Sequence, residues 1–175
     1  AEAYLSDVNA AGTADFSCDF LTINPLMGED CLDPFVEVAI THNKGLFILL
    51  ETSNPGASMI LKETLETQKK VNEKIAAYIS SVHERVGIKP NAVGPLGCVV
   101  GATNSNIAHW REKLPHSTFL MPGIGAQGGG WDAVRACVSG HQDDVWIPIS
   151  RGITFVPHPI QSKDEYINAV SENAD

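Results

Sequence analysis

Short apolar runs alternate with segments of helical pattern along the whole chain, and this alternation constrains the fold more than any other feature. The runs are rich in aliphatic, β-branched and aromatic residues, as buried strands are, and they cover residues 20–24, 45–50, 97–102, 118–121 and 144–149. The run at 45–50 is apolar without interruption, which is typical of a parallel sheet covered on both faces. Alternation of this kind predicts an α/β fold with a parallel sheet and outer helices.

Helix signals lie between these runs. Pro34 falls near the predicted start of one helix, where proline is favoured, and Ser162 with Glu165 has the spacing of a capping box. Pro148 predicts a bulge or an irregular end in the last strand. The predicted helices are 1–11, closed by Gly12; Asp30 or Asp33 to Ile40; 58–86, in one or two pieces; a helix capped by Asn104 or Ser105 that runs to about Leu114; 131–138; and 162 to about Val170.

No internal repeat, low-complexity segment or linker divides the chain, so we expect residues 1–175 to form a single domain or part of one. Two architectures fit the alternation: an open doubly wound sheet, or a (β/α)8 TIM barrel of which this chain supplies roughly strands 4 to 8. The first residues, Ala1 to Leu5, have the pattern of a helix interior without a capping residue. This start favours the barrel and leads us to expect a further N-terminal segment.

The composition argues against several classes of partner. A formal net charge of −9 without a basic stripe argues against nucleic acid and against an acidic membrane surface. No apolar run reaches the length of a transmembrane helix. The cysteines show no C-x-x-C and no Cys/His cluster, so we expect a cytoplasmic protein without a metal site, in which these thiols are reduced: Cys18, Cys31, Cys98 and Cys137.

A glycine-rich stretch at 122–130 follows the fourth apolar run and leads into a helical segment. It holds five glycines in nine residues, which allow positive φ angles and leave backbone N–H groups uncovered. Amides gathered between the end of a strand and the start of a helix form an anion site without charged side chains. The stretch therefore predicts a phosphate-bearing ligand, and the alternative is a tight turn that binds nothing.

Polar side chains follow the predicted strands at their carboxyl ends, where parallel α/β folds place their active sites. They are Asn24, Thr52, Ser53, Asn54, Thr103, Gln127, Ser150 and Arg151. Taken alone, Ser53 and Asn54 are more typical of an ordinary turn. Arg151 could be a surface ion-pair partner, but it follows a buried strand whose acidic neighbours, such as Asp144, lie at the opposite end. An unpaired guanidinium in that place suits bidentate binding of phosphate.

If this chain supplies strands 4 to 8 of a barrel, the glycine-rich stretch and Ser150–Arg151 would follow strands seven and eight. The loops after these two strands form the usual phosphate site of such barrels. A rival interpretation is an NADP-binding oxidoreductase. Gly123, Gly125 and Gly128 match the G-x-G-x-x-G dinucleotide pattern, and Arg151 would then hold an adenosine 2′-phosphate. That pattern normally belongs to the first strand–helix unit of its fold, whereas here it lies in the fourth, so the two-part phosphate site is favoured.

Five sequence blocks, each at a predicted strand end, together resemble one family. They are T-I-N-P-L-M-G-E-D at 22–30, L-L-E-T-S-N-P-G at 49–56, V-V-G-A-T at 99–103, P-G-I-G-A-Q-G-G at 122–129 and S-R-G-I at 150–153. In this order they are similar to the longer subfamily of orotidine 5′-phosphate decarboxylase over nearly the whole chain. The resemblance implies a (β/α)8 barrel, usually a homodimer, that converts orotidine 5′-phosphate to UMP and CO₂ in pyrimidine biosynthesis without metal or organic cofactor.

The resemblance also implies which residues hold the substrate. Ser53 would contact the pyrimidine edge, and Gln127 would bridge the ligand and its phosphate from a closing loop. Pro122 and Gly123 would pack over the ring. Arg151 and the amides around Ser150 would bind the phosphate. Supporting positions would be Thr52, Asn54 and Asn24.

The family's catalytic Lys/Asp block, D-x-K-x-x-D, occurs nowhere in residues 1–175. The family's order places this block upstream of Ala1, so we expect no catalytic residue in this chain and no activity without the N-terminal segment. The chain would then carry the substrate-binding half of the enzyme. The alternative is a non-catalytic nucleotide- or phosphate-binding module that only resembles the decarboxylase.

Overall fold

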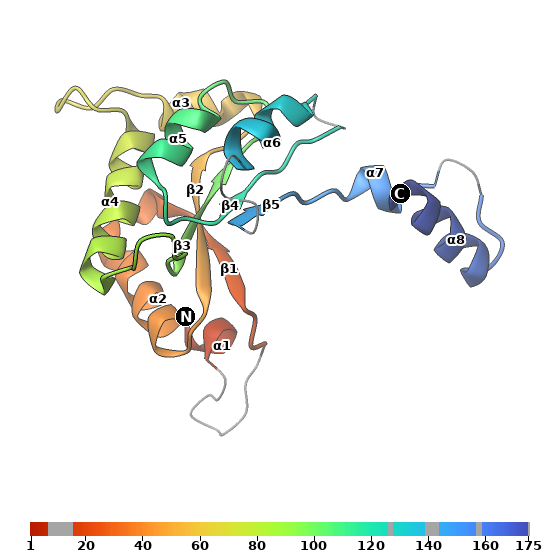
Figure 1. Ribbon diagram of the computed structural model, residues 1–175, viewed down its shortest axis with the longest axis horizontal. Coiled ribbons are helices and arrows are strands. Elements are labelled where there is room, and N and C mark those ends of the chain that lie inside the picture. The colour runs from red at the N-terminus through yellow and green to blue at the C-terminus, as the bar shows by residue number, and fades with distance from the viewer. Residues whose placement is uncertain (7–15, 126–127, 139–143, 157–158, 175) are drawn as a thin grey trace.

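Five parallel strands form one sheet in the computed structural model, which describes every residue except 7–15, 126–127, 139–143, 157–158 and 175 (Figure 1). The strands lie in chain order, and each pairs in parallel with the next. A doubly wound sheet reverses its strand order at a switch point, whereas a barrel wall does not. The order confirms the barrel prediction over the doubly wound alternative. The strands are β1 Phe20–Ile23, β2 Gly45–Glu51, β3 Leu96–Val100, β4 Phe119–Leu120 and β5 Val145–Trp146.

Helices join the strands, and α2 and α4 pack on the sheet (Figure 1). The predicted helix 58–86 is two helices, because the chain between α3 and α4 makes a turn closed by an antiparallel bridge from Thr64 to Lys70. The helices are α1 Glu2–Leu5, η1 Pro25–Met27, α2 Glu29–Thr41, η2 Pro55–Ala57, α3 Ser58–Leu61, α4 Val71–Val86, α5 Ile107–Lys113, α6 Trp131–Val138, α7 Arg151–Thr154 and α8 Lys163–Ala174.

The helix-covered face of the sheet carries the main core. Side chains alternate between the two faces of a strand, so every second residue points to the helices. Burial of each such aliphatic or aromatic side chain stabilises the fold by about 1.5–3 kcal/mol. The central strands place these fully buried residues there: Leu46, Ile48 and Leu50 on β2, Leu96, Cys98 and Val100 on β3, and Phe119 on β4.

The opposite face is closed by aromatic rings from strands that are far apart in the sheet. Phe20 on β1 and Trp146 on β5 belong to the two edge strands, yet their ring centroids are 4.8 Å apart. Phe47 of β2 packs on both, at 4.8 and 5.5 Å. Contact between edge strands requires a strongly curled sheet, as in a partial barrel. Trp146 is still 43% exposed, so this inner face remains partly open.

The C-terminal segment forms a separate arm. Helices α7 and α8 contact each other and project away from the sheet (Figure 1). The backbone N–H of Glu165 donates to Ser162 Oγ at 3.1 Å, which confirms that half of the predicted capping box. The Glu165 carboxylate accepts from the N–H of Gln161 rather than from that of Ser162.

Several predicted boundaries were wrong. Helix α2 begins at Glu29, next to the predicted Asp30 and not at Asp33, so Pro34 lies inside the helix rather than in its first turn. Helix α5 begins at Ile107 after Asn106, and Asn104 is not its cap. The last two strands pair over only two residues each, and β5 ends before Pro148, which cannot donate to a ladder. Among the described residues, the first predicted helix comprises only Glu2–Leu5.

A buried ion pair fixes α5 to the start of β5. Arg111 is 6% exposed, and its Nη1 donates to Asp144 Oδ2 at 2.8 Å. Its Nη2 donates to the Ser117 carbonyl at 2.7 Å, and the guanidinium lies 3.9 Å from the Phe119 ring centroid. This end of the sheet is opposite to the carboxyl ends of the strands, so the pair serves packing.

His83 gives the fold a pH dependence that can be measured. It is 4% exposed, and burial with the nearby His116 lowers the pKa of His83 to about 4. The unfolded chain therefore binds a proton at His83 more readily than the folded chain does. The free energy of unfolding decreases as the pH is lowered from about 6.5 to about 4. Between pH 7 and pH 4.5 we expect His83 to account for roughly 2–3 kcal/mol of lost unfolding free energy. Urea titrations at pH 7 and pH 4.5 measure this loss. The unfolding free energy of His83→Gln should fall by that much less than that of the native chain, and equal losses would mean that His83 is not the group responsible.

Candidate functional site

The carboxyl ends of β2, β3 and β4 come together at one edge of the sheet. The N–H of Gly101, after β3, donates to the Glu51 carbonyl at the end of β2 at 2.8 Å. The N–H of Ala102 donates to the Pro122 carbonyl after β4 at 2.9 Å. A Cβ on Gly101 would stand 2.6 Å from Ser53 Cβ, so the absence of a side chain there lets the two loops touch. The structure thus joins the predicted Ser53 and Pro122 segments through β3.

The glycine-rich loop confirms one part of its prediction and corrects another. Gly123, Gly125 and Gly128 have φ angles of 102°, 70° and 84°, which favour glycine. The N–H groups of Gly125, Gly128 and Gly129 are not uncovered, because they donate to carbonyls within the loop at 3.2, 2.8 and 2.9 Å. In this conformation these three N–H groups are not available to an anion. A Cβ on Gly129 would meet the Gly123 carbonyl oxygen at 2.6 Å, so the loop is tightly closed.

The polar residues after β1 and β2 organise their own turns. Asn24 Oδ1 accepts from the N–H of Leu26 at 3.0 Å and so caps η1. Thr52 Oγ1 donates to Asn54 Oδ1 at 2.7 Å. These bonds organise the two turns that follow β1 and β2.

The sequence predicted Arg151 at the end of a buried strand, and this prediction was wrong. Strand β5 ends at Trp146, and Arg151 begins helix α7 on the projecting arm, with its side chain exposed. The carbonyl of Ser150 accepts from the N–H groups of Ile153 and Thr154 within the same turn. Within the described part of the chain, no hydrogen bond or ion pair engages the Arg151 guanidinium. Gln127, the predicted lid contact, lies outside the described residues.

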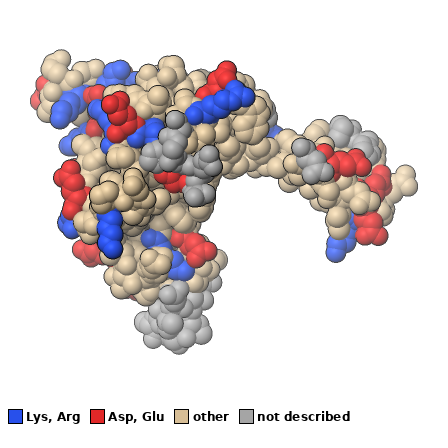
Figure 2. Space-filling model, viewed as in Figure 1, with Lys and Arg blue, Asp and Glu red and all other residues tan. Residues whose placement is uncertain are grey.

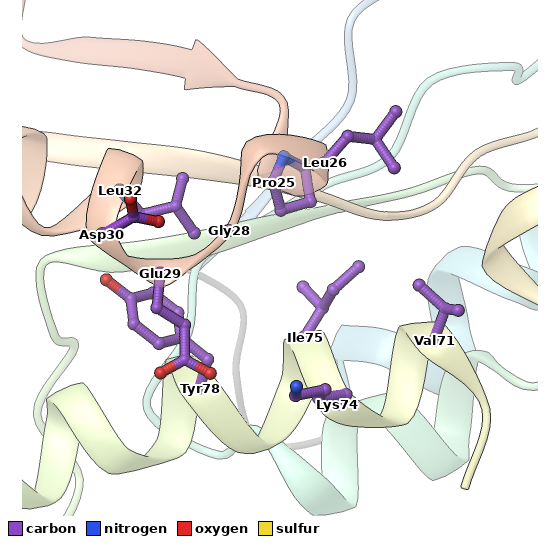
Figure 3. Close-up of a pocket in the computed structure, with 10 residues that line it drawn as sticks. All are labelled: Pro25, Leu26, Gly28, Glu29, Asp30, Leu32, Val71, Lys74, Ile75 and Tyr78. Atoms are coloured by element: carbon purple, nitrogen blue, oxygen red, sulfur yellow. The ribbon is translucent and has the colours of Figure 1, made fainter. Parts of the chain in front are cut away.

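A pocket of about 360 Å³ lies beside this edge, between α4 and the segment that follows β1 (Figure 3). Val71, Ile75 and Tyr78 of α4 form one wall, and Pro25 and other residues of η1 and α2 form the other. Its one basic side chain, Lys74, stands against two acidic ones, Glu29 and Asp30. None of the predicted substrate contacts lines it, and its charge does not suit an anionic ligand.

The described residues contain no cluster of three or more His, Cys, Asp or Glu side chains arranged to hold a metal ion. All four cysteines are free. Over the same part of the chain, no helix combines the length and apolarity needed to cross a membrane. Figure 2 shows lysine and arginine interspersed with aspartate and glutamate on the face in view, without a continuous basic surface.

Gly101 should be intolerant of a side chain. In Gly101→Ala the new Cβ would stand within 2.9 Å of Ser53 Cβ, N and Cα, so one loop must shift. We expect a loss of roughly 1–3 kcal/mol in the free energy of unfolding, measured by urea denaturation. Gly130→Ala is the matched control, because nothing lies within 4 Å of its Cβ position, and it should change stability by less than about 0.5 kcal/mol. Equal effects of the two changes would mean that the Ser53 contact is not tight.

The roles of two residues at this edge were not predicted from the sequence. Asn104, predicted as a helix cap, instead donates from Nδ2 to the carbonyls of Glu51 and Gly101 at 2.9 and 3.1 Å. The Glu51 carboxylate is buried behind the same loops, with Trp110 Nε1 as a donor. The only sequence signal for Glu51 was a charged residue ending an apolar run.

Comparisons with known proteins agree with this geometry. The chain is 33% identical over 174 residues to orotidine 5′-phosphate decarboxylase of Rhodopirellula baltica, covering 99% of this chain and 55% of that protein. It is 38% identical over 141 residues to the same enzyme of Clostridium botulinum, covering 79% of this chain and 48% of that protein. The chain thus spans about half the length of the curated relatives it matches.

A solved structure and a family model support the same assignment. A putative orotidine 5′-phosphate decarboxylase from Streptomyces avermitilis superposes with a TM-score of 0.70 at 29% identity, covering 93% of this chain and 54% of that one. The family model described as orotidine 5′-phosphate decarboxylase / HUMPS family matches residues 5–166. With strand order, loop blocks and relatives in agreement, the chain belongs to the orotidine 5′-phosphate decarboxylase / HUMPS family.

Proposed function

We propose that this chain is the substrate-binding half of an orotidine 5′-phosphate decarboxylase, which forms UMP and CO₂ in pyrimidine biosynthesis. One observation carries the proposal: the loops after β2, β3 and β4, which contain three of the family's sequence blocks, meet at one edge of the sheet. There Ser53 would contact the pyrimidine, and Pro122, Gly123 and Gln127 would close over the ring. Arg151 and the amides around Ser150 would bind the phosphate.

Substrate binding contributes directly to the chemistry of such a reaction. Loss of CO₂ leaves negative charge at C6 of the pyrimidine, which needs a fixed positive group and a proton donor beside it. Residues 1–175 contain no D-x-K-x-x-D block to supply them. Contacts to the remote phosphate would supply binding energy that is used in the transition state. Loop closure would exclude water from the ring.

The open face of the sheet supports the need for a second segment. Phe20, Phe47 and Trp146 face a half-closed interior, and β1 and β5 are unpaired edges in the described sheet. Further strands that carry the Lys/Asp block would cover both and complete one domain with residues 1–175. Exposed apolar side chains at the site edge, Leu26, Met27 and Met59, would suit a homodimer interface. We place the assembly in the cytoplasm, and no cofactor enters the proposal.

UMP titration and a turnover assay test the proposal together. The chain is mixed with, or joined to, the N-terminal segment of a relative that carries the Lys/Asp block, and the loss of orotidylate absorbance is followed. Binding of UMP with turnover only in the combined protein is the expected result. UMP binding without turnover in a folded combined protein would favour the non-catalytic nucleotide-binding module. NADP binding is not expected, because the consecutive strand order has no switch point for a dinucleotide.

A further inference from the structure

Glu51 is a buried carboxylate directly before the loop Thr52–Asn54. It is 1% exposed and ends strand β2. The register between β2 and β3 shifts at this point, from Leu49 opposite Val99 to Glu51 opposite Val100. The irregularity puts Glu51 in register with the helix-facing row of β3, so its side chain points away from the ligand edge and into the layer beneath it.

The carboxylate is held from two directions. Trp110 Nε1 of α5 donates to Oε2, and Lys62 Nζ, just after α3, lies 3.2 Å from Oε1. A buried carboxylate costs several kcal/mol unless such partners compensate it. Packing alone would not require it, since an apolar residue of similar volume fills such a site at little cost.

The backbone of the same residue ties the loop after β2 to the loop after β3. Its carbonyl accepts from the Gly101 N–H at 2.8 Å and from Asn104 Nδ2 at 2.9 Å. Asn104 Nδ2 also donates to the Gly101 carbonyl at 3.1 Å, and Gly101 in turn touches Ser53. The side chain and the carbonyl of Glu51 therefore fix the path of the chain from which Ser53 projects.

We propose that Glu51 is a positioning residue for recognition of the pyrimidine. Its carboxylate, held by Trp110 and Lys62, sets the place of Ser53 without touching the ligand. This inference rests on the proposed function, in which Ser53 contacts the base and Arg151 the phosphate. It follows that loss of the Glu51 carboxylate weakens contacts to the base and leaves contacts to the phosphate unchanged.

The test compares Glu51→Leu and Glu51→Gln with a matched control, Asp144→Asn, in the full 175-residue chain. Asp144 is also a buried, ion-paired carboxylate, but it lies at the opposite end of the sheet. Hydrogen exchange of a peptide spanning 52–57 reports the loop directly. Titration with UMP and with ribose 5-phosphate separates the base from the phosphate. Urea denaturation shows whether each variant is folded.

In Glu51→Leu we expect exchange at 52–57 to rise, and UMP affinity to fall, each by about tenfold. Affinity for ribose 5-phosphate should stay within twofold of the native value. Glu51→Gln keeps an acceptor for Trp110, so its exchange rate and its UMP affinity should lie between those of the native chain and Glu51→Leu. If Glu51→Leu does not fold, Glu51→Gln alone provides the test. Asp144→Asn should lower stability with neither change at 52–57 nor selective loss of UMP.

Unchanged exchange at 52–57 in a folded Glu51 variant overturns the inference, whatever the ligand data show. Equal losses of UMP and ribose 5-phosphate overturn it as well. If the native chain binds no UMP at all, the proposed function fails, and the exchange comparison alone then decides whether Glu51 positions the loop.

Discussion

Arg111→Ala is expected to destabilise the chain by about 3–5 kcal/mol in urea denaturation. The substitution removes two hydrogen bonds, to Asp144 Oδ2 and to the Ser117 carbonyl, and the contact of the guanidinium with Phe119. It also removes the Arg111 cation from beside the buried Asp144 carboxylate. The cost arises mainly from the loss of positive charge beside this carboxylate, because a weakened charge balance in the interior is far less favourable than a missing contact.

Arg135→Ala supplies the control for this prediction. Arg135 also pairs with an aspartate, Asp132, but on the exposed surface of α6, where its side chain is 73% exposed. Solvent screens such pairs, so we expect Arg135→Ala to lower the free energy of unfolding by less than about 1 kcal/mol. The double variant Arg111→Met with Asp144→Leu removes both charges and should recover most of the stability. If the double variant is as unstable as Arg111→Ala, the loss of positive charge beside Asp144 is not the main cause.

The architecture could be predicted from the sequence because its signals are local. The unbroken apolar run at 45–50 demanded a strand covered on both faces, and the helical segments that follow each strand demanded parallel pairing. The ends of β4 and β5 could not be predicted. Their apolar runs continue past the two paired residues of each strand, and pairing depends on neighbours rather than on hydrophobicity.

The meeting of loops at one edge of the sheet could be predicted from the sequence, and the contacts that hold these loops in place could not. The loops at Ser53 and at 122–130 follow strands, and parallel strands place such loops at one edge. The contact of Glu51 with Trp110 joins residues 59 positions apart and depends on the register shift after Leu49, so no local pattern announced it. Asn104 was mistaken for a helix cap because a side chain that can cap an N-terminus can equally bind two carbonyls.

Arg151→Ala is expected to weaken UMP binding by about a hundredfold or more. A guanidinium that donates two charge-assisted bonds to phosphate contributes about 1.5–3 kcal/mol for each bond. Calorimetric titration at low and moderate salt measures the loss, which should shrink as salt screens the native contact. The UMP affinity of Arg151→Lys should lie between those of the native chain and Arg151→Ala, because an ammonium keeps the charge and loses the bidentate geometry.

Uridine separates the phosphate contact from every other effect of this substitution. Because uridine lacks the phosphate, Arg151→Ala should leave its affinity unchanged, and Arg135→Ala should change the affinity of neither ligand. Arg151 lies at the start of the α7–α8 arm, and the described residues offer its guanidinium no partner. A phosphate that binds both Arg151 and the glycine-rich loop would therefore restrain the arm against the sheet. Equal losses for UMP and uridine would instead mean that Arg151 shapes the site from a distance and does not bind the phosphate.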